Sequence, residues 1–247
     1  MWVSIIESYI IPNAYVSMFD YAIGNPPWLS YRYIADPDYQ ENVIKPLMKD
    51  YYNLTTSDEL ITHMEMATLF FVRSIDMYLK DGGKIGFVMP RSIFNADQHH
   101  NFRAGYVSRV NFTIRKVMDL DGVEPLFYVP ACAIIAEKDG KTQYPIPAIR
   151  ISGKLPQDRY KTMPLTEVSK MLTFEDRQLY LDTLGKRSTW DYKSMEYRAS
   201  SRSYYYDKFK EGAAVVPRPL FFVDIKDVTG DTVIVKSAKR VVERKEG

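Results

Sequence analysis

The sequence predicts an α/β fold built on an open, mostly parallel sheet with one antiparallel pair at its edge. Apolar segments follow the order strand, helix, strand, helix, strand between residues 19 and 120, which is typical of a parallel sheet with right-handed crossovers. The third and fourth expected strands, at 111–120 and 131–136, have no helix between them. We therefore expect them to pair antiparallel at one edge, and we expect functional groups at the C-terminal ends of the strands.

Composition narrows the class of protein. Apolar residues make up 46% of the 247 residues, which is enough for a substantial core. The sequence has neither a run of about 20 apolar residues nor a secretory signal, so we expect a cytoplasmic protein without a membrane segment. Cys132 is the single cysteine, and the three histidines lack metal-ligand spacing, so no metal site is expected.

The first predicted strand is 19–24, an apolar segment that ends at two consecutive prolines, because prolines cannot continue a strand ladder. Residues 28–56 have no clear period and predict a long ordered loop. A capping box at 56–59 opens a helix whose apolar residues recur every three to four positions as far as Leu79. Gly82 and Gly83 are expected to end that helix.

The rest of the chain divides less clearly. Residues 84–89 form a second expected strand that ends at Pro90, and 91–108 are expected to be partly helical. Later elements are a strand or extended arm at 143–155, a helix around 175–183, and strands at 220–223 and 232–236. We expect one domain at 1–155, with a linker and the start of a further module at 156–247.

Asn25-Pro26-Pro27-Trp28, at the end of an apolar strand, is the strongest chemical signal. The Asn25 amide oxygen and the Pro26 carbonyl are fixed acceptors, and each could take one hydrogen of an exocyclic amino group. Such an arrangement would free the nitrogen lone pair for attack on a methyl group by positioning and electrostatics alone. Trp28 could stack on a base swung out of a duplex. The alternative interpretation of the tetrapeptide is a turn with a packed tryptophan.

These residues resemble a known family, the amino-methyltransferases that modify adenine in DNA, and in particular the methylase modules of restriction-modification systems. The resemblance begins at Phe19-Asp20-Tyr21-Ala22-Ile23-Gly24-Asn25-Pro26-Pro27-Trp28 and covers about residues 15–140. It implies a Rossmann-like methyltransferase sheet, an N6-adenine DNA methyltransferase activity and double-stranded DNA as partner. It also implies that an aromatic residue before the last strand holds the flipped base, with Phe127 as first choice and Tyr128 as second.

S-adenosylmethionine is the cofactor that the resemblance implies, but its glycine-containing binding loop is not found in this sequence. Gly24 is the first glycine, and no Gly-x-Gly turn precedes Asn25. The cofactor-binding residues are therefore unknown. We expect a fragment whose N-terminal half, or a partner subunit, binds the cofactor, and we expect the chain alone to be inactive.

A basic and aromatic stretch follows the expected sheet. Residues 185–218 hold eight Lys and Arg against four Asp and Glu, a pattern that suits contact with DNA phosphates and bases, although a partly buried linker explains it equally well. The candidate DNA-binding residues are Lys186, Arg187, Lys193, Arg198, Arg202 and Arg218. Val216-Pro217-Arg218-Pro219 also resembles, weakly, the entry to a DNA-recognition region.

Two other functions remain open. One is a methyltransferase that acts on a protein glutamine, although that family usually has tyrosine after Asn-Pro-Pro. The other is a non-catalytic DNA-binding or assembly module. Cytosine in place of adenine is also an open target, and no acidic pair with a lysine indicates a nuclease site.

Overall fold

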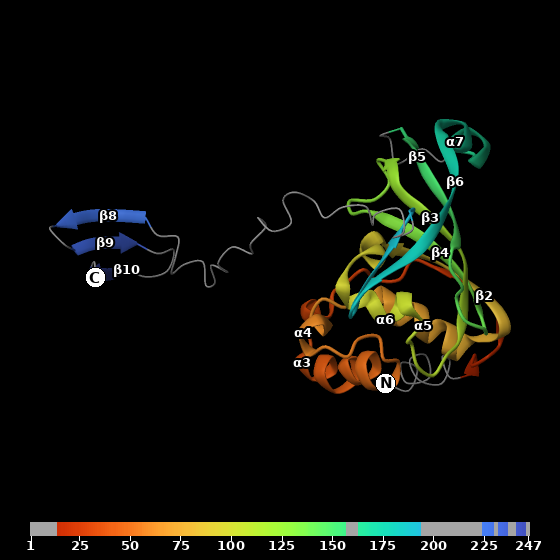
Figure 1. Ribbon diagram of the computed structural model, residues 1–247, viewed down its shortest axis with the longest axis horizontal. Coiled ribbons are helices and arrows are strands. Elements are labelled where there is room, and N and C mark those ends of the chain that lie inside the picture. Colours follow the sequence, from red (N-terminus) through yellow and green to blue (C-terminus); the bar gives the residue numbers. More distant parts are fainter. Residues whose placement is uncertain (1–13, 157–162, 194–223, 230–231, 237–240, 246–247) are drawn as a thin grey trace, which may run out of the picture. The chain divides into compact units, whose positions relative to one another are not determined.

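The computed structural model describes residues 14–156, 163–193, 224–229, 232–236 and 241–245 of the chain (Figure 1). The chain divides into two compact units, residues 1–198 and 199–247. The second unit contains a three-stranded antiparallel sheet, formed by β8 (Asp224–Thr229), β9 (Thr232–Lys236) and β10 (Val241–Lys245). The strand expected at 232–236 is thereby confirmed, whereas the one at 220–223 lies outside the described residues.

The first unit is a mixed α/β structure around a seven-stranded sheet in the order β1-β2-β4-β3-β5-β6-β7. Its strands are β1 (Phe19–Gly24), β2 (Leu79–Pro90), β3 (Phe112–Glu124), β4 (Ala131–Lys138), β5 (Ile146–Lys154), β6 (Leu172–Leu184) and β7 (Arg187–Asp191). Two neighbouring pairs, β1 with β2 and β3 with β5, are parallel, and the other four are antiparallel. The sheet is thus less parallel than the sequence predicts.

The expected antiparallel pairing of 111–120 with 131–136 is confirmed, because β3 and β4 pair in that direction. Their expected position at an edge is wrong. Strand β4 lies between β2 and β3, and β5, β6 and β7 extend the sheet beyond β3. The helix expected at 175–183 is also wrong, since these residues lie in β6, and the helix that directly precedes this strand is α7 (Leu165–Met171).

The core lies between the sheet and helix α5 (Met66–Tyr78), which Figure 1 shows packed beside α6 (His100–Ala104). Phe71 of α5 is fully buried and meets Phe87, Phe102 and Phe112 edge-on, at ring-centroid distances of 5.9, 5.6 and 5.9 Å. Such edge-to-face contacts add to the stabilisation from apolar burial. These contacts hold α5 and α6 against β2 and β3.

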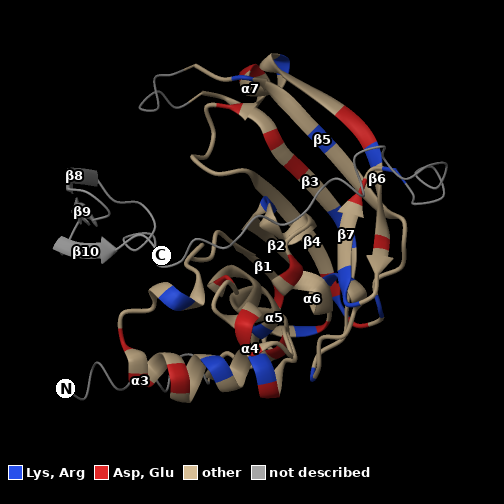
Figure 2. Cartoon of the chain, turned by 60° about the vertical axis from the view of Figure 1, so that its left-hand side comes forward, with Lys and Arg blue, Asp and Glu red and all other residues tan. Residues whose placement is uncertain are grey.

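The long loop expected at 28–56 contains regular structure, so this prediction is wrong in part. A 3₁₀ turn, η2 (Tyr31–Tyr33), precedes a helical segment that runs through α3 (Pro37–Tyr39), η3 (Gln40–Ile44) and η4 (Leu47–Tyr51). Along it acidic and basic residues are interspersed (Figure 2), and Lys45 and Glu41 form an ion pair at 2.8 Å. The helical period is hidden in the sequence because both π-helical turns depart from 3.6 residues per turn.

The helix expected from 58 to 79 is broken into α4 (Asp58–Ile61) and α5. Ser57 caps α4 by accepting the Leu60 amide, one residue after the Thr56 cap that the capping box predicts, so the cap is serine with Leu60 and not Glu59 at the third helical position. The break follows because the Tyr31 amide donates to the Met64 carbonyl at 2.7 Å and Glu65 pairs with Ser30 in an antiparallel bridge. Pairing with the preceding loop therefore overrides helical propensity.

Gly82 and Gly83 do not end the helix, and that prediction is wrong. Helix α5 ends at Tyr78, and β2 starts at the extended Leu79. Gly82 takes φ +73° inside β2, a left-handed conformation that favours glycine. A Cβ on Gly83 would lie 2.8 Å from the Lys80 carbonyl oxygen, so the start of β2 needs the glycine pair.

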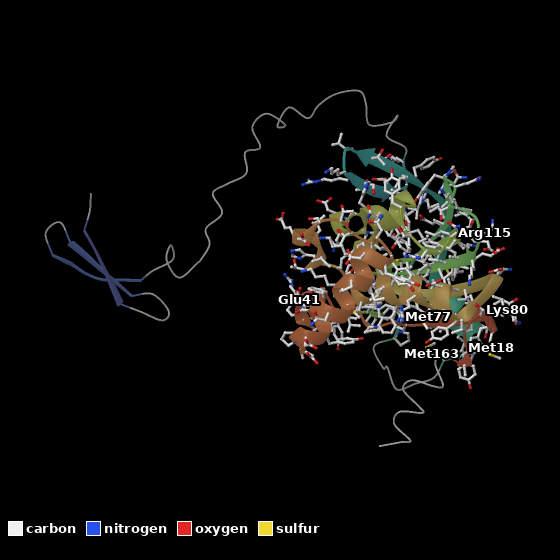
Figure 3. All side chains as sticks on the ribbon, turned by 90° about the horizontal axis from the view of Figure 1, so that it is seen from below. Met18, Glu41, Met77, Lys80, Arg115 and Met163 are labelled. Carbon is white, nitrogen blue, oxygen red and sulfur yellow. The ribbon has the colours of Figure 1, made fainter. Side chains whose placement is uncertain are left out.

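Strand β1 forms the outer edge of the seven-stranded sheet. Ala22 is partly buried and packs against the core, whereas Tyr21 and Ile23 are 69% and 89% exposed. At this edge Lys80 lies near Met18, far from Glu41 (Figure 3), and Lys80 pairs with Asp20 at 3.0 Å. No helix among the described residues has the length and apolar character to cross a bilayer.

A buried guanidinium connects the end of the sheet to the helices. Arg103 of α6 donates to the carbonyl oxygens of Ile93, Ala96 and Ser188 and to the Ser188 hydroxyl. Burial lowers the pKa of Arg103 to about 10, so the side chain stays protonated at neutral pH. Because Ser188 lies in β7, this side chain joins the last strand of the sheet to α6 and to the 3₁₀ turn η5 (Arg91–Phe94).

Candidate active site

The loop after β1 places Asn25-Pro26-Pro27-Trp28 at the end of the edge strand. Strand β1 runs parallel to β2, with Gly24 opposite Phe87, so both strands end on the same side of the sheet. Asn25 is exposed and Pro26 is buried. Among the described residues no hydrogen bond reaches the Asn25 amide or the Pro26 carbonyl. Neither residue lines the cavity described below, and both acceptors lack a hydrogen-bond partner among the described residues.

The structure brings Trp28 together with Phe127. The Trp28 indole Nε1 donates to the Val88 carbonyl at 3.2 Å, which fixes the ring against the end of β2. The ring centroids of Trp28 and Phe127 are 5.2 Å apart, and the ring planes are tilted by 45°. Phe127 is 39% exposed, and its neighbour Tyr128 is 93% exposed. Of the two aromatic candidates, Phe127 contacts Trp28.

A cavity of about 430 Å³ opens beside Trp28. Its walls come from the loop after β1, the start of α5, the loop after β2 and the segment before β4. The lining residues are Trp28, Glu65, Pro90, Arg91, Ser92, Asn95, Val129 and Pro130. A cavity with an aromatic wall and a few converging polar groups suits a planar heterocycle.

Arg91 is held firmly at this cavity. Its guanidinium makes two hydrogen bonds to the buried Asp119 carboxylate, at 2.9 and 3.0 Å, and lies 4.7 Å over the Phe94 ring. The Tyr192 hydroxyl donates to the same carboxylate at 2.5 Å. Burial and this hydrogen bond raise the pKa of Tyr192 well above its usual range, so it remains a donor. Asp119 thus fixes Arg91 and neutralises its charge.

Sequence reasoning missed most of the cavity. Arg91 and Ser92 directly follow a strand that ends at Pro90, so the rule that sites gather at strand C-termini could have found them. Glu65 and Asn95 gave no such signal, because each reaches the cavity through contacts between distant segments. His99, which lies behind Glu65, is fully buried, and no cluster of metal-binding side chains is present among the described residues.

Three of the candidate DNA-binding residues do not line this cavity, and the other three lie outside the described residues. Lys186 and Arg187 are exposed at the turn between β6 and β7, and Arg187 pairs with Asp97 at 3.2 Å. Lys193 is exposed after β7, whereas Arg198, Arg202 and Arg218 lie outside the described residues. Trp190, from the same stretch, is buried and donates to the Tyr144 hydroxyl at 2.7 Å, so that ring belongs to the core.

The described residues do not fit S-adenosylmethionine in the way that its usual sites do. Helical turns follow β1 and β2, but neither strand is connected to them by a Gly-x-Gly turn that would bring backbone amides close to a cofactor. No residue of the described chain is therefore assigned to the cofactor.

A family model of known proteins matches the part of the chain that contains the loop after β1. Residues 7–127, just under half of the chain, match the family model of the Eco57I restriction-modification methylases. This segment ends at Phe127 and includes the loop after β1, Glu65 and the loop after β2. No curated protein matches the chain.

Solved structures give distant similarities. The Type ISP restriction-modification enzyme LlaGI, solved as a nuclease-deletion mutant with a DNA substrate mimic, shares 13% identity at a TM-score of 0.46; the match covers 75% of this chain and 19% of that one. A modification subunit of a putative type I restriction enzyme from Vibrio vulnificus YJ016 shares 13% identity at 0.39, covering 73% and 40%. The type IIG endonuclease BpuSI shares 16% identity at 0.40, covering 68% and 20%.

The chain therefore spans between 19% and 40% of the length of these three structures. The family match supports a methyltransferase of the restriction-modification type for residues 7–127. This match does not identify the methyl donor, the target base or the DNA partner.

Proposed function

We propose that the loop after β1 and the adjoining cavity form the target-base site of a DNA methyltransferase that methylates the exocyclic N6 amino group of adenine, with S-adenosylmethionine as methyl donor. One observation carries the proposal: Trp28 lines the cavity beside Phe127, and the acceptors of Asn25 and Pro26, three and two residues before it, have no partner among the described residues. The match to restriction-modification methylases adds to it.

The two acceptors explain how the site would activate a weak nucleophile. The adenine amino lone pair is delocalised into the ring. When the Asn25 Oδ1 and the Pro26 carbonyl oxygen each accept one amino hydrogen, the nitrogen moves toward a tetrahedral shape and its lone pair becomes available. S-adenosylmethionine, when bound, supplies the methyl group on a sulfonium. The nitrogen gains the methyl group and releases one proton.

The two rings would hold the base by stacking. A base between Trp28 and Phe127 needs about 7 Å, because each stacked layer takes about 3.5 Å. The rings are now 5.2 Å apart, so the base enters only when one ring moves. Phe127 is the ring that moves, because it is 39% exposed in a loop, whereas Trp28 is hydrogen-bonded to Val88.

Double-stranded DNA is the proposed partner, and the predicted contacts of Lys186, Arg187 and Lys193 with its phosphates belong to the same proposal. These side chains are exposed, as phosphate-binding residues must be. Arg198, Arg202 and Arg218 remain predictions from the sequence, as does the division of the chain at residue 155.

The test is the binding of adenosine to the ¹⁵N-labelled full chain, followed at the indole N–H resonance of Trp28. We expect adenosine to shift this resonance, and we expect Phe127→Leu to weaken binding about tenfold, since stacking on one aromatic ring contributes about 1–3 kcal/mol. Phe174→Leu is the matched control, because Phe174 is similarly exposed on β6. If adenosine leaves the Trp28 resonance unchanged, the cavity is not a base site.

A further inference from the structure

Glu65 lies where three separate segments of the chain meet. Its backbone forms an antiparallel bridge with Ser30. On either side, the Met66 amide donates to the Leu29 carbonyl at 2.8 Å, and the Tyr31 amide donates to the Met64 carbonyl at 2.7 Å. The main chain around Glu65 therefore fixes the loop that carries Trp28.

The Glu65 side chain fixes the opposite wall of the same cavity. The Ser92 hydroxyl lies 2.8 and 2.7 Å from the two carboxylate oxygens, and the His99 Nε2 lies 2.8 Å from one of them. Ser92 belongs to the turn after β2, and His99 belongs to the next 3₁₀ turn, η6 (Asp97–His99). The Glu65 side chain is only 15% exposed, and that of His99 is fully buried. Glu65 therefore connects the loop after β1 with the turn after β2 and with η6.

The directions of these hydrogen bonds follow from the carboxylate. An ionised carboxylate only accepts, so Ser92 donates its proton and His99 donates from Nε2. The other ring nitrogen, Nδ1, lies 3.3 Å from the Thr68 hydroxyl. In the neutral ring this nitrogen accepts the Thr68 proton. Each donor has an acceptor, and charge-assisted bonds to a buried carboxylate are the stronger kind.

We infer that Glu65 is a positioning residue of the proposed base site, which sets the separation between the Trp28 wall and the Arg91–Ser92 wall of the cavity. The inference rests on the proposed function. Its basis is the double attachment, in which the backbone of Glu65 holds the loop after β1 and the carboxylate holds the loop after β2. Without the carboxylate, the main-chain bridge remains but the Ser92 wall loses its anchor.

Glutamine distinguishes a positioning role from a role of the charge itself. In Glu65→Gln the amide oxygen can accept from Ser92 while the amide N–H donates to the His99 Nε2. His99 then takes its other tautomer, and its Nδ1–H donates to the Thr68 hydroxyl. The whole network is rebuilt without charge. In Glu65→Ala neither Ser92 nor His99 has this acceptor, so the buried His99 and the half-buried Ser92 both lose a partner.

The experiment compares Glu65→Ala, Glu65→Gln and the control Glu59→Ala in the adenosine titration of the full chain. Glu59 is exposed on α4. Thermal unfolding is followed for every protein, and titrations are carried out where all of them are folded. We expect Glu65→Ala to move the Trp28 indole resonance in the free protein and to weaken adenosine binding about tenfold. Glu65→Gln should bind within about twofold of wild type, and Glu59→Ala should match wild type.

The outcomes separate this inference from the proposed function. If wild type binds adenosine and Glu65→Ala binds equally well, Glu65 positions nothing, although the base site stands. If Glu65→Gln is as weak as Glu65→Ala, the charge acts directly and the positioning role is wrong. If Trp28 does not respond to adenosine in wild type, the base site itself fails and this inference fails with it. If Glu65→Ala does not fold, Ser92→Ala takes its place, because it removes only the hydroxyl that binds the Glu65 carboxylate. The inference then requires that Ser92→Ala weakens adenosine binding.

Discussion

Asn25→Ala should lower the rate of methyl transfer about 10²- to 10³-fold in the assembly that carries out the reaction. The substitution removes the Asn25 side-chain amide, which is one of the two proposed acceptors for the hydrogens of the adenine amino nitrogen. Removing one preorganised electrostatic contact lowers a reaction rate by about this factor. DNA affinity should stay largely unchanged, because Asn25 is an exposed loop residue without charge. The measurement is single-turnover methyl transfer together with a DNA-binding titration.

Asn111→Ala is the matched control for this substitution. Asn111 is an exposed asparagine immediately before β3, and its side chain lines none of the described cavities. We expect this variant to react at the wild-type rate. A variant at Asn25 that keeps the wild-type rate would show that its amide does not act on the amino group.

Arg103→Met should destabilise the first unit by about 3–5 kcal/mol. The substitution removes the Arg103 donors from the carbonyls of Ile93 and Ser188 and one of the two donors from that of Ala96, and each buried group left unsatisfied costs about 1–3 kcal/mol. It also removes the Arg103 hydrogen bonds between α6 and β7. Chemical denaturation at neutral pH, followed by circular dichroism, measures the change in the free energy of unfolding.

Arg115→Met provides the comparison for Arg103. Arg115 is a half-exposed arginine of β3 that pairs with Glu137 at 3.1 Å, and exposed pairs contribute about 0–1 kcal/mol. Should Arg103→Met not accumulate as a folded protein, Arg103→Lys keeps the charge but loses the forked donors, and it should be less destabilising. Equal unfolding free energies for Arg103→Met and Arg115→Met would contradict the anchoring role.

The sequence predicts the part of the fold whose signals are local. Strand β1 ends at two prolines, Ser57 caps a helix, and β2 ends at Pro90, so these boundaries follow from backbone chemistry. The errors lie where distant segments decide the outcome. The break before α5 arises from the bridge between Ser30 and Glu65, and the strand at 172–184 arises from pairing with β5 and β7.

In the candidate site, too, local motifs are predicted from the sequence and contacts between distant segments are not. Asn25 and Trp28 stand in one short motif, and the structure brings Trp28 into contact with Phe127, although these two residues lie about a hundred positions apart. Glu65, Ser92 and His99 are joined only by tertiary contacts. No spacing in the sequence brings them together, because each belongs to a different loop.

The proposed role of the cavity beside Trp28 is to present the amino group of adenine for methylation. The most direct measurement is mass spectrometry of the nucleosides released from long unmethylated DNA of mixed sequence, after incubation of the methyl-transferring assembly with isotopically labelled S-adenosylmethionine. We expect labelled N6-methyl-2′-deoxyadenosine as the product, and we expect Asn25→Ala to yield little of it. Label in N4-methylcytosine, or in protein glutamine instead of DNA, would contradict it.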